Sequence, residues 1–312
     1  MTPRVLVTGA TGFIGTAVSA QLLAEGKYRV REALRSAPSN LAAGADRVVV
    51  GPVTGATDWR TALAEVSAVV HLAARAHVGR DGSADPLAEF RVVNVAGTLN
   101  LARQAAAAGI ERFIFLSSVK VHGETGTFRE ADPPAPADAY GMSKHEAEEG
   151  LRRIAAETGL ELVIIRPPLV YGQGVKANFR ALMRAVARGV PLPLGGIRNR
   201  RSLVALDNLV DVILVSLQHP AAVNETFLVS DGEDVSTPDL IRRLAAAMGC
   251  KARLISVSPA VLLFAATLLG RRDAARRLVG SLQVDISRVR QVLDWAPRVS
   301  VDVGIRRAVA SL

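Results

Sequence analysis

Three glycines near the start of the chain, Gly9, Gly12 and Gly15, separate a short apolar run from an amphipathic segment. The run Val5–Val7 predicts a buried strand, and Phe13–Glu25 shows apolar residues at helical spacing up to a glycine. A glycine-rich turn between a strand and a helix lets the backbone approach the diphosphate of a dinucleotide, which then lies at the helix N-terminus. A tight turn without a ligand is the alternative. We expect contacts to a dinucleotide from Gly9, Thr11, Gly12, Phe13, Ile14 and Gly15.

Strands and helices alternate in the sequence up to residue 172. Continuous apolar runs predict strands covered on both faces at Ala68–Leu72, Phe113–Leu116 and Leu162–Ile165, and Pro86–Ala108 predicts a long helix. This alternation indicates an α/β fold, a Rossmann-type doubly wound parallel sheet. We assign residues 1–172 to an NAD(P)-binding domain into which a later segment, about 201–230, is interleaved. Residues 173–312 then form mainly a smaller C-terminal substrate-binding lobe.

The residues after the second predicted strand, Tyr28–Leu34, bear on which dinucleotide is bound. An NAD site usually carries Asp or Glu there, to hold the ribose 2′-hydroxyl. In this chain Leu34 occupies that place and is followed by Arg35 and Ser36, whose guanidinium and hydroxyl suit a 2′-phosphate. We therefore expect NADP(H), bound in part by Arg35 and Ser36. NAD is the alternative, with Arg35 a solvated loop charge.

Three polar residues in the middle of the chain suggest proton transfer. Tyr140 precedes Lys144 by one helical turn, so both side chains project from one helix face, and Ser118 follows the strand Phe113–Leu116. A tyrosine pKa of about 10 is too high for a base at neutral pH, but a nearby ammonium and an oxidised nicotinamide both lower it. We predict that Ser118, Tyr140 and Lys144 are catalytic and move a proton at a carbinol oxygen during hydride transfer. The alternative for Tyr140 and Lys144 is an ordinary surface pair.

In its motifs the chain resembles the extended short-chain dehydrogenase/reductase family, in its nucleotide-sugar epimerase/dehydratase/reductase branch. The resemblance covers essentially the whole length. It rests on the segments Thr8–Gly15, His71–Ala74, Asn94–Thr98, Leu116–Gly123, Tyr140–Lys144, Arg166–Gly172 and Leu293–Pro297.

The resemblance implies further site residues. Those implied for the cofactor are Leu72, Ala73, Ala74, Asn94, Ser117, Tyr140, Lys144 and Pro167, and those implied for a UDP-sugar are His77, Ser118, Asn178 and Arg201. Asn178 and Arg201 would face the substrate diphosphate. Each has a simpler alternative: Asn178 as a helix cap, Arg201 as a solvated charge at a strand edge, and His77 as a structural residue.

The branch contains dehydratases, epimerases and reductases, which share the same catalytic set. Dehydratases carry acidic residues after the catalytic hydroxyl, whereas Val119 and Lys120 stand here, so dehydration is disfavoured. In Arg200–Leu209 and the apolar segment near residue 260 the chain resembles bacterial reductases that form UDP-N-acetylquinovosamine for surface polysaccharide. We expect an NADP(H)-dependent reductase of a UDP-4-keto sugar. The alternatives are an NAD-dependent C4 epimerase of UDP-hexoses or UDP-N-acetylhexosamines and, more remotely, a non-catalytic NADPH-sensing regulator.

Composition limits the other function classes. The formal charge is +9, but no block of basic residues occurs and aromatic residues make up 4% of the chain, so we expect no nucleic-acid partner. The five histidines are scattered without ligand spacing, and no metal is expected. The single cysteine, Cys250, cannot form an internal disulfide and no signal peptide is recognised, so a cytoplasmic location is expected, with Cys250 in the core.

Two segments bear on association with other molecules. The family resemblance implies a homodimer formed by the helix Pro86–Ala108 and the helix that carries Tyr140. The most apolar stretch, Pro259–Leu269, is shorter than the roughly 20 residues that span a bilayer, and we expect a buried helix. Because arginines follow it at 271, 272, 276 and 277, peripheral contact with the inner membrane is the alternative.

Overall fold

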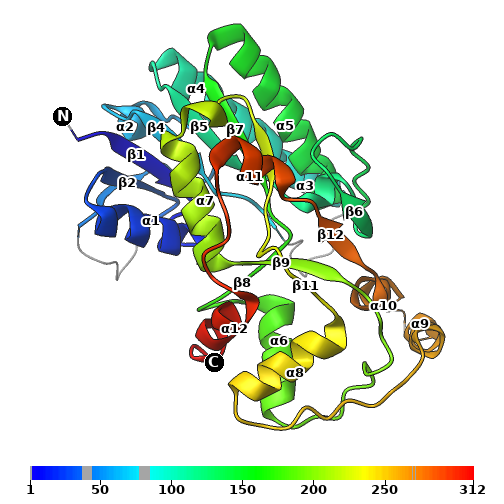
Figure 1. Ribbon diagram of the computed structural model, residues 1–312. Helices are drawn as coiled ribbons and strands as arrows, with labels where there is room; N and C mark the ends of the chain where they lie inside the picture. The colour runs from blue at the N-terminus through cyan, green and yellow to red at the C-terminus, as the bar shows by residue number, and fades with distance from the viewer. Residues whose placement is uncertain (1, 37–43, 77–84, 269, 271) are drawn as a thin grey trace.

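The computed structural model describes residues 2–36, 44–76, 85–268, 270 and 272–312. Its main feature is a seven-stranded sheet in which every described pair is parallel (Figure 1). The strand order is β10-β7-β5-β4-β1-β2-β3, and the strands are β1 (Arg4–Thr8), β2 (Arg29–Leu34), β3 (Asp46–Val49), β4 (Ala68–His71), β5 (Arg112–Leu116), β7 (Glu161–Arg166) and β10 (Thr226–Leu228). The predicted Rossmann-type doubly wound fold is confirmed.

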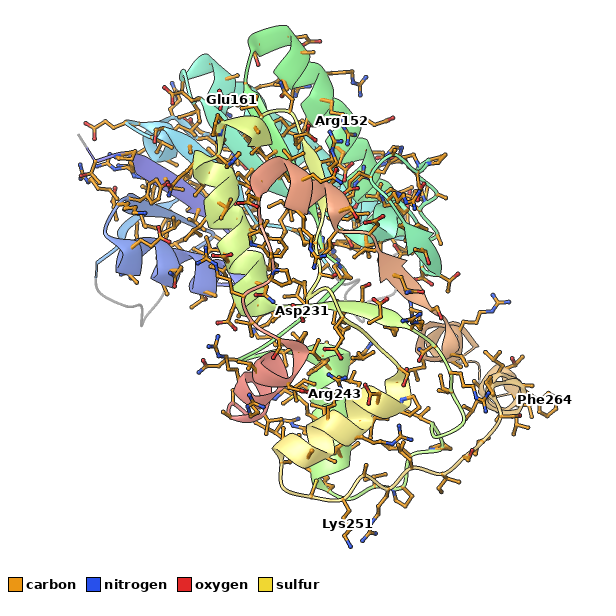
Figure 2. All side chains as sticks on the ribbon, in the orientation of Figure 1. Arg152, Glu161, Asp231, Arg243, Lys251 and Phe264 are labelled. Atoms are coloured by element: carbon orange, nitrogen blue, oxygen red, sulfur yellow. The ribbon has the colours of Figure 1, made fainter. Side chains whose placement is uncertain are left out.

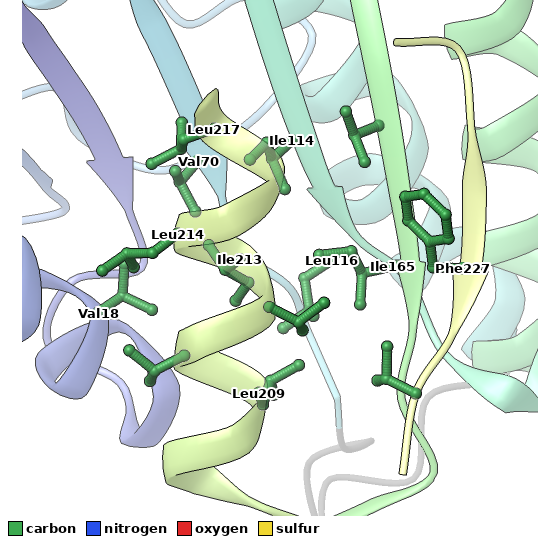
Figure 3. Close-up of a cluster of buried hydrophobic side chains, with 14 of the residues drawn as sticks. Val18, Val70, Ile114, Leu116, Ile165, Leu209, Ile213, Leu214, Leu217 and Phe227 are labelled. Atoms are coloured by element: carbon green, nitrogen blue, oxygen red, sulfur yellow. The ribbon is translucent and has the colours of Figure 1, made fainter. Parts of the chain in front are cut away.

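Helices cover both faces of this sheet. One face carries α1 (Phe13–Glu25), α7 (Leu206–Gln218) and α11 (Ser287–Leu293), and the other carries α2 (Arg60–Leu63), α4 (Thr98–Ala107) and α5 (Ala139–Thr158). Figure 3 shows α7 packed on the face of the sheet, with Leu209 and Ile213 directed at Leu116 and Ile165. Leu209, Ile213 and Ile165 are 0% exposed. Each such side chain contributes about 1.5–3 kcal/mol through burial, so α7 belongs to the sheet although it lies late in the sequence.

The predicted helix Pro86–Ala108 forms as one continuous run of three parts: α3 (Pro86–Phe90), the π-helix η1 (Arg91–Gly97) and α4. Proline at the first position and an Asp85 carboxylate that accepts a hydrogen bond from the Ala88 N–H begin it. The π-helical turn was not expected, because apolar spacing does not distinguish a local π-turn from a regular helix. Such turns are often found at functional sites.

A second, smaller core lies below the sheet in Figure 1. It is formed by α6 (Ala177–Ala187), α8 (Thr237–Ala247), α12 (Val301–Val309), β8 (Leu169–Tyr171), β9 (Arg201–Ala205) and β11 (Asp234–Val235). Strand β9 also pairs with β12 (Leu282–Val284), which continues to β6 (Gly126–Phe128). Ile286, Val289, Leu293 and Trp295 return to the core of the large sheet, where the Trp295 indole donates to Asp211 at 2.7 Å. The chain therefore crosses between the two cores several times.

Two helices, α9 (Pro259–Leu268) and α10 (Arg272–Val279), pack on each other at the margin of the protein (Figure 1). The expectation that the apolar helix is buried is wrong, since α9 contains no buried residue. Within the described residues no helix combines the length and hydropathy needed to cross a membrane. The expectation for Cys250 is also wrong, because this residue is exposed.

Candidate active site

The glycine loop joins β1 to α1 at the carboxyl edge of the sheet. Gly9 has φ +69°, and a Cβ there would lie 2.8 Å from the backbone nitrogen of Ala73. A Cβ at Gly15 would lie 2.1 Å from the Gly9 carbonyl oxygen. The loop is thus packed backbone to backbone in a way that no other residue type allows. Thr11 and Gly12 are exposed at its tip, while Phe13 and Ile14 are half-buried against the core.

The N-terminus of α1 fits a bound phosphate. Its N-cap is Gly12, which makes no side-chain cap, and its first turn contains no acidic residue. The first N–H groups of any α-helix lack an intrahelical partner, and here no side chain caps them. The helix dipole also favours an anion at this position. Arg35 and Ser36 follow β2 at the same edge of the sheet and are exposed.

A buried histidine holds the next loop, which contains Leu72, Ala73 and Ala74. The His71 Nδ1 lies 2.7 Å from the Thr8 hydroxyl, and Nε2 lies 2.9 Å from the Thr98 hydroxyl. The Thr8 oxygen also accepts hydrogen bonds from the N–H groups of Leu72 and Ala73, both at 3.2 Å. Burial, and secondarily Lys144, lower the pKa of His71 to about 3, so the imidazole is neutral at physiological pH. Leu72 and Ala73 are half-buried and Ala74 is exposed.

Asn94 lies in the π-helical turn and is fully buried. Its Oδ1 accepts from the Arg75 N–H at 2.9 Å, and its Nδ2 donates to the Arg75 carbonyl at 3.0 Å. The same amide donates to the Ser143 hydroxyl at 2.9 Å, and Ser143 in turn donates to the Tyr140 carbonyl at 2.8 Å. Asn94 thus joins the loop after β4 to the first turn of α5. His77, predicted to contact substrate, lies outside the described residues.

The three predicted catalytic residues come from two elements that pack on each other. Ser118 is half-buried and precedes the short 3₁₀ helix η2 (Val119–Val121), and its hydroxyl accepts from the Lys120 N–H at 3.2 Å. Tyr140 and Lys144 lie on the first turns of α5, which contacts η2 directly. Asp138 caps α5 by accepting from the Gly141 N–H at 2.7 Å, and it also pairs with the Lys120 ammonium. The structure therefore brings Ser118, Tyr140 and Lys144 to one edge of the sheet.

Burial controls the electrostatics of the pair on α5. Burial, then Asp138, raise the pKa of Tyr140 to about 12. Burial lowers the pKa of Lys144 to about 7, while Glu148 acts in the opposite direction. The Lys144 ammonium donates to the Leu116 carbonyl at 2.7 Å and lies 4.4 Å from the centre of the Phe115 ring. Without a bound dinucleotide, burial thus outweighs any effect of Lys144 on the pKa of Tyr140, and the lysine ammonium is directed at a carbonyl.

A buried ion pair lies under these residues and was missed by the sequence reasoning. Glu148 is 0% exposed and is bound through both oxygens by Arg166, whose Nε lies 2.9 Å from Oε1. Ser117 donates to the same carboxylate at 2.5 Å, so its hydroxyl is directed into the protein. Arg166 also contacts His122 Nε2 at 2.7 Å, and His122 stacks on Phe128. The helical spacing of Glu148 from Lys144 was the available signal.

The backbone of Pro167 connects β7 to the Ser118 turn. Its carbonyl accepts a hydrogen bond from the Val119 N–H at 3.0 Å, while the Ile165 carbonyl accepts from the Ser117 N–H at 2.8 Å. The ends of β5 and β7 are thereby held together next to the predicted catalytic residues.

None of the predicted substrate residues in the described part of the chain lines the cavity next to α9 and α10. That cavity has a volume of about 670 Å³ and is lined by His122, Gly123, Glu124, Thr125, Ala135, Ala137, Leu263, Arg276, Arg277, Val279 and Gly280. Asn178 is exposed in the first turn of α6, and the Arg201 guanidinium donates to the carbonyls of Arg277 and Gly280 at 2.6 and 3.1 Å. Neither lines the cavity, whereas Arg276 and Arg277 do. Within the described residues, no group of three or more His, Cys, Asp or Glu side chains is placed to hold a metal ion.

Comparison with known proteins finds relatives of full length. The chain is 45% identical to the UDP-glucose 4-epimerase of Vibrio cholerae over 315 residues, which covers 98% of this chain and 94% of that protein. Among solved structures it is similar to the UDP-glucuronic acid 4-epimerase of Bacillus cereus in complex with NAD, with a TM-score of 0.80, 22% identity and coverage of 99% and 98%. It is also similar to MoeE5 in complex with UDP-glucuronic acid and NAD, with a TM-score of 0.80, 25% identity and the same coverage.

These matches correct the predicted reaction. The expectation of a 4-ketoreductase that forms UDP-N-acetylquinovosamine is wrong, because the full-length relative at 45% identity is a 4-epimerase and the solved neighbours include UDP-sugar 4-epimerases. The alternative, C4 epimerisation, is better supported. The preference for NADP(H) is also unsupported, since the similar structures contain NAD.

The predicted membership of the extended short-chain dehydrogenase/reductase group is confirmed, and the chain is an enzyme of its nucleotide-sugar type. The model of the NAD dependent epimerase/dehydratase family matches residues 5–230, which include the glycine loop, the Ser118 turn and the start of α5. The chain belongs to the NAD dependent epimerase/dehydratase family.

Proposed function

We propose that this protein is an NAD-dependent C4 epimerase of UDP-hexoses or UDP-N-acetylhexosamines. The observation that carries the proposal is 45% identity to a UDP-glucose 4-epimerase over 98% of the chain. The packing of the glycine loop and the placing of Ser118, Tyr140 and Lys144 at one edge of the sheet support it. Reduction of a 4-keto sugar would use the same three residues, so the catalytic set does not distinguish the two reactions. Sequence identity to a 4-epimerase over the whole chain is what favours epimerisation.

The glycine loop and the N-terminus of α1 would hold the diphosphate of the dinucleotide. Contacts would come from the loop residues 9–15 and from Leu72, Ala73 and Ala74. Thr8 holds the backbone N–H groups of Leu72 and Ala73. We assign NAD because the similar structures contain NAD. The exposed Arg35 is then free to act as a solvated charge.

NAD bound there would accept a hydride from C4 of the sugar and return it, and its oxidised form would supply a positive charge that lowers the pKa of Tyr140. Tyr140 removes the proton of the C4 hydroxyl as the 4-keto sugar forms, and gives it back after the sugar has turned over. Ser118 donates a hydrogen bond to the same oxygen. Lys144 stabilises the phenolate by its charge and would hold the nicotinamide ribose. Ordinary general acid–base chemistry thus serves both directions of the reaction.

The substrate site of this proposal is the cavity lined by Arg276 and Arg277. It begins at the 122–125 loop that follows Ser118 and at Ala137, three residues before Tyr140. Guanidinium groups suit the diphosphate of a UDP-sugar, and Glu124 pairs with Arg277 at 3.4 Å. Asn178 and Arg201 remain proposed contacts, although the Arg201 guanidinium is engaged by backbone carbonyls.

The test measures bound dinucleotide and turnover in the same preparation. Denatured protein should release NAD, and the native enzyme should interconvert UDP-glucose and UDP-galactose, or their N-acetyl counterparts, without net use of NADH or NADPH. Tyr140→Phe should lower kcat by about 100- to 10,000-fold while the dinucleotide is retained. Stoichiometric oxidation of NADPH with a UDP-4-keto sugar and no epimerisation would refute the proposal. Retained cofactor without any turnover would favour the sensing regulator.

A homodimer is part of this proposal. The helical run 86–107 and α5 pack side by side, and each carries an exposed apolar residue, Val92 at 49% and Met142 at 38%. Size-exclusion chromatography with light scattering should report two copies for the wild type and one for Val92→Glu. A monomeric wild type contradicts the expectation.

A further inference from the structure

Helix α9 presents an apolar face to solvent. Val261, Phe264 and Leu268 are 57%, 67% and 74% exposed, and with Ala265 they occupy positions i, i+3, i+4 and i+7, so they share one side of the helix. Figure 2 shows Phe264 at the margin of the protein, pointing away from its body. No charged residue occurs between Pro259 and Leu268. A helix at the surface of a globular protein normally turns polar residues outward. An exposed apolar face of this kind indicates a surface that binds another molecule.

The charge around α9 indicates which occupant fits. Residues 259–281 contain four arginines, at positions 271, 272, 276 and 277, and a single acidic residue, Asp273, in a chain whose formal charge is +9. Arg276 and Arg277 are exposed on α10, on which α9 packs. Two copies meeting through this face would bring like charges together, which disfavours self-association. An apolar layer bordered by negative charge satisfies both features at once.

We propose that the α9–α10 hairpin binds the surface of an anionic lipid membrane. Val261, Phe264 and Leu268 enter the acyl region, and the excess positive charge of the hairpin favours an anionic lipid surface. A helix of this kind lies in the plane of the interface, which agrees with the absence of a spanning helix among the described residues. Because Leu263, Arg276 and Arg277 line the 670 Å³ cavity, docking would place the entrance of that cavity beside the membrane. The inference does not depend on the reaction catalysed.

Vesicle flotation of the full chain tests the proposal. The protein is mixed with vesicles of phosphatidylcholine alone or of equimolar phosphatidylglycerol and phosphatidylcholine. We compare the wild type with Phe264→Asp/Leu268→Asp and with the control Val49→Asp/Leu312→Asp, which alters two exposed apolar residues, 55% and 41% exposed, remote in sequence from the hairpin. Both double variants change the net charge equally. Thermal unfolding and solution turnover, which should be unchanged, show that each variant is folded.

The wild type and the control should float with the phosphatidylglycerol vesicles, and high salt should weaken this binding. The hairpin variant should bind at least about tenfold more weakly, because burial of two large apolar side chains is lost. Equal binding by the hairpin variant and the control would overturn the proposal, as would a wild type that binds no vesicle. A wild type that forms larger oligomers, dispersed by the hairpin substitutions, would also overturn it and assign the face to a second copy.

Discussion

A Cβ at Gly141 would lie 2.6 Å from the carbonyl oxygen of Lys120, so α5 meets the turn after Ser118 backbone to backbone. This contact, with the Asp138 cap and its pair to Lys120, sets the distance between the Tyr140 helix and the Ser118 turn. The absence of a side chain at Gly141 thus decides how closely α5 approaches the turn after Ser118.

Gly141→Ala should therefore lower kcat strongly while leaving dinucleotide affinity within a few-fold. In an open helix this substitution would stabilise the protein by about 1 kcal/mol, but here overpacking should destabilise it by about 1–3 kcal/mol. Urea unfolding and steady-state kinetics measure the two effects. Ala139→Gly, which loosens the same helical turn without adding atoms, separates a general disturbance of this turn from displacement of the Ser118 turn by the added Cβ. A stabilised and fully active Gly141→Ala would contradict the packing argument.

Gly15→Ala should abolish dinucleotide binding and destabilise the protein, since its Cβ would lie 2.1 Å from the Gly9 carbonyl oxygen. Because the nearest atoms are backbone, neither partner can rotate away. Titration with NAD and thermal unfolding provide the measurements. The matched control is Gly55→Ala, whose Cβ would meet Ala96 at an ordinary 3.4 Å and should change neither quantity.

Glu148→Gln should shift the pH profile of kcat/KM. Burial lowers the pKa of Lys144 to about 7, and the Glu148 carboxylate opposes this effect. Without that charge the lysine pKa falls further, so the loss of activity on the alkaline side should move to lower pH by about one unit. The variant should also be less stable by about 3 kcal/mol, because Arg166 keeps a buried charge. Glu148→Asp should restore the profile in part. If Glu148 had only a structural role, the Gln variant would be less stable but its pH profile of kcat/KM would match that of the wild type.

Acid should destabilise the protein through His71. Burial, then Lys144, lower its pKa from the ordinary 6.5 to about 3. Below about pH 6.5 the unfolded chain binds a proton that the folded protein does not, so stability falls as the pH drops toward 3, by up to about 1.4 kcal/mol per unit. Urea unfolding between about pH 7 and pH 4 should show a shallower slope for His71→Gln than for the wild type. The surface substitution His219→Gln serves as control, and equal slopes in all three proteins would be inconsistent with a buried neutral imidazole.

Much of the framework was predictable because the signals are local. The glycine loop, the spacing of Tyr140 and Lys144, and the apolar runs of the strands reflect backbone periods that adjacent residues set among themselves. The resemblance to a family of nucleotide-sugar enzymes followed from the same segments and was confirmed. The reaction was predicted wrongly, because reduction and epimerisation use the same catalytic set and an exposed arginine after β2 does not by itself select NADP(H).

The sequence by itself determined the order of strands and helices, and it predicted a loop for a dinucleotide and the residues that we propose transfer a proton. Only the tertiary structure decided that Lys144 donates to the Leu116 carbonyl, that Glu148 is buried against Arg166, and that the apolar face of α9 is exposed. The physical reason is that local periodicity follows from backbone hydrogen bonding within one element. Burial, and the pKa shifts that follow from it, depend on segments far apart in the chain that meet only in the folded protein.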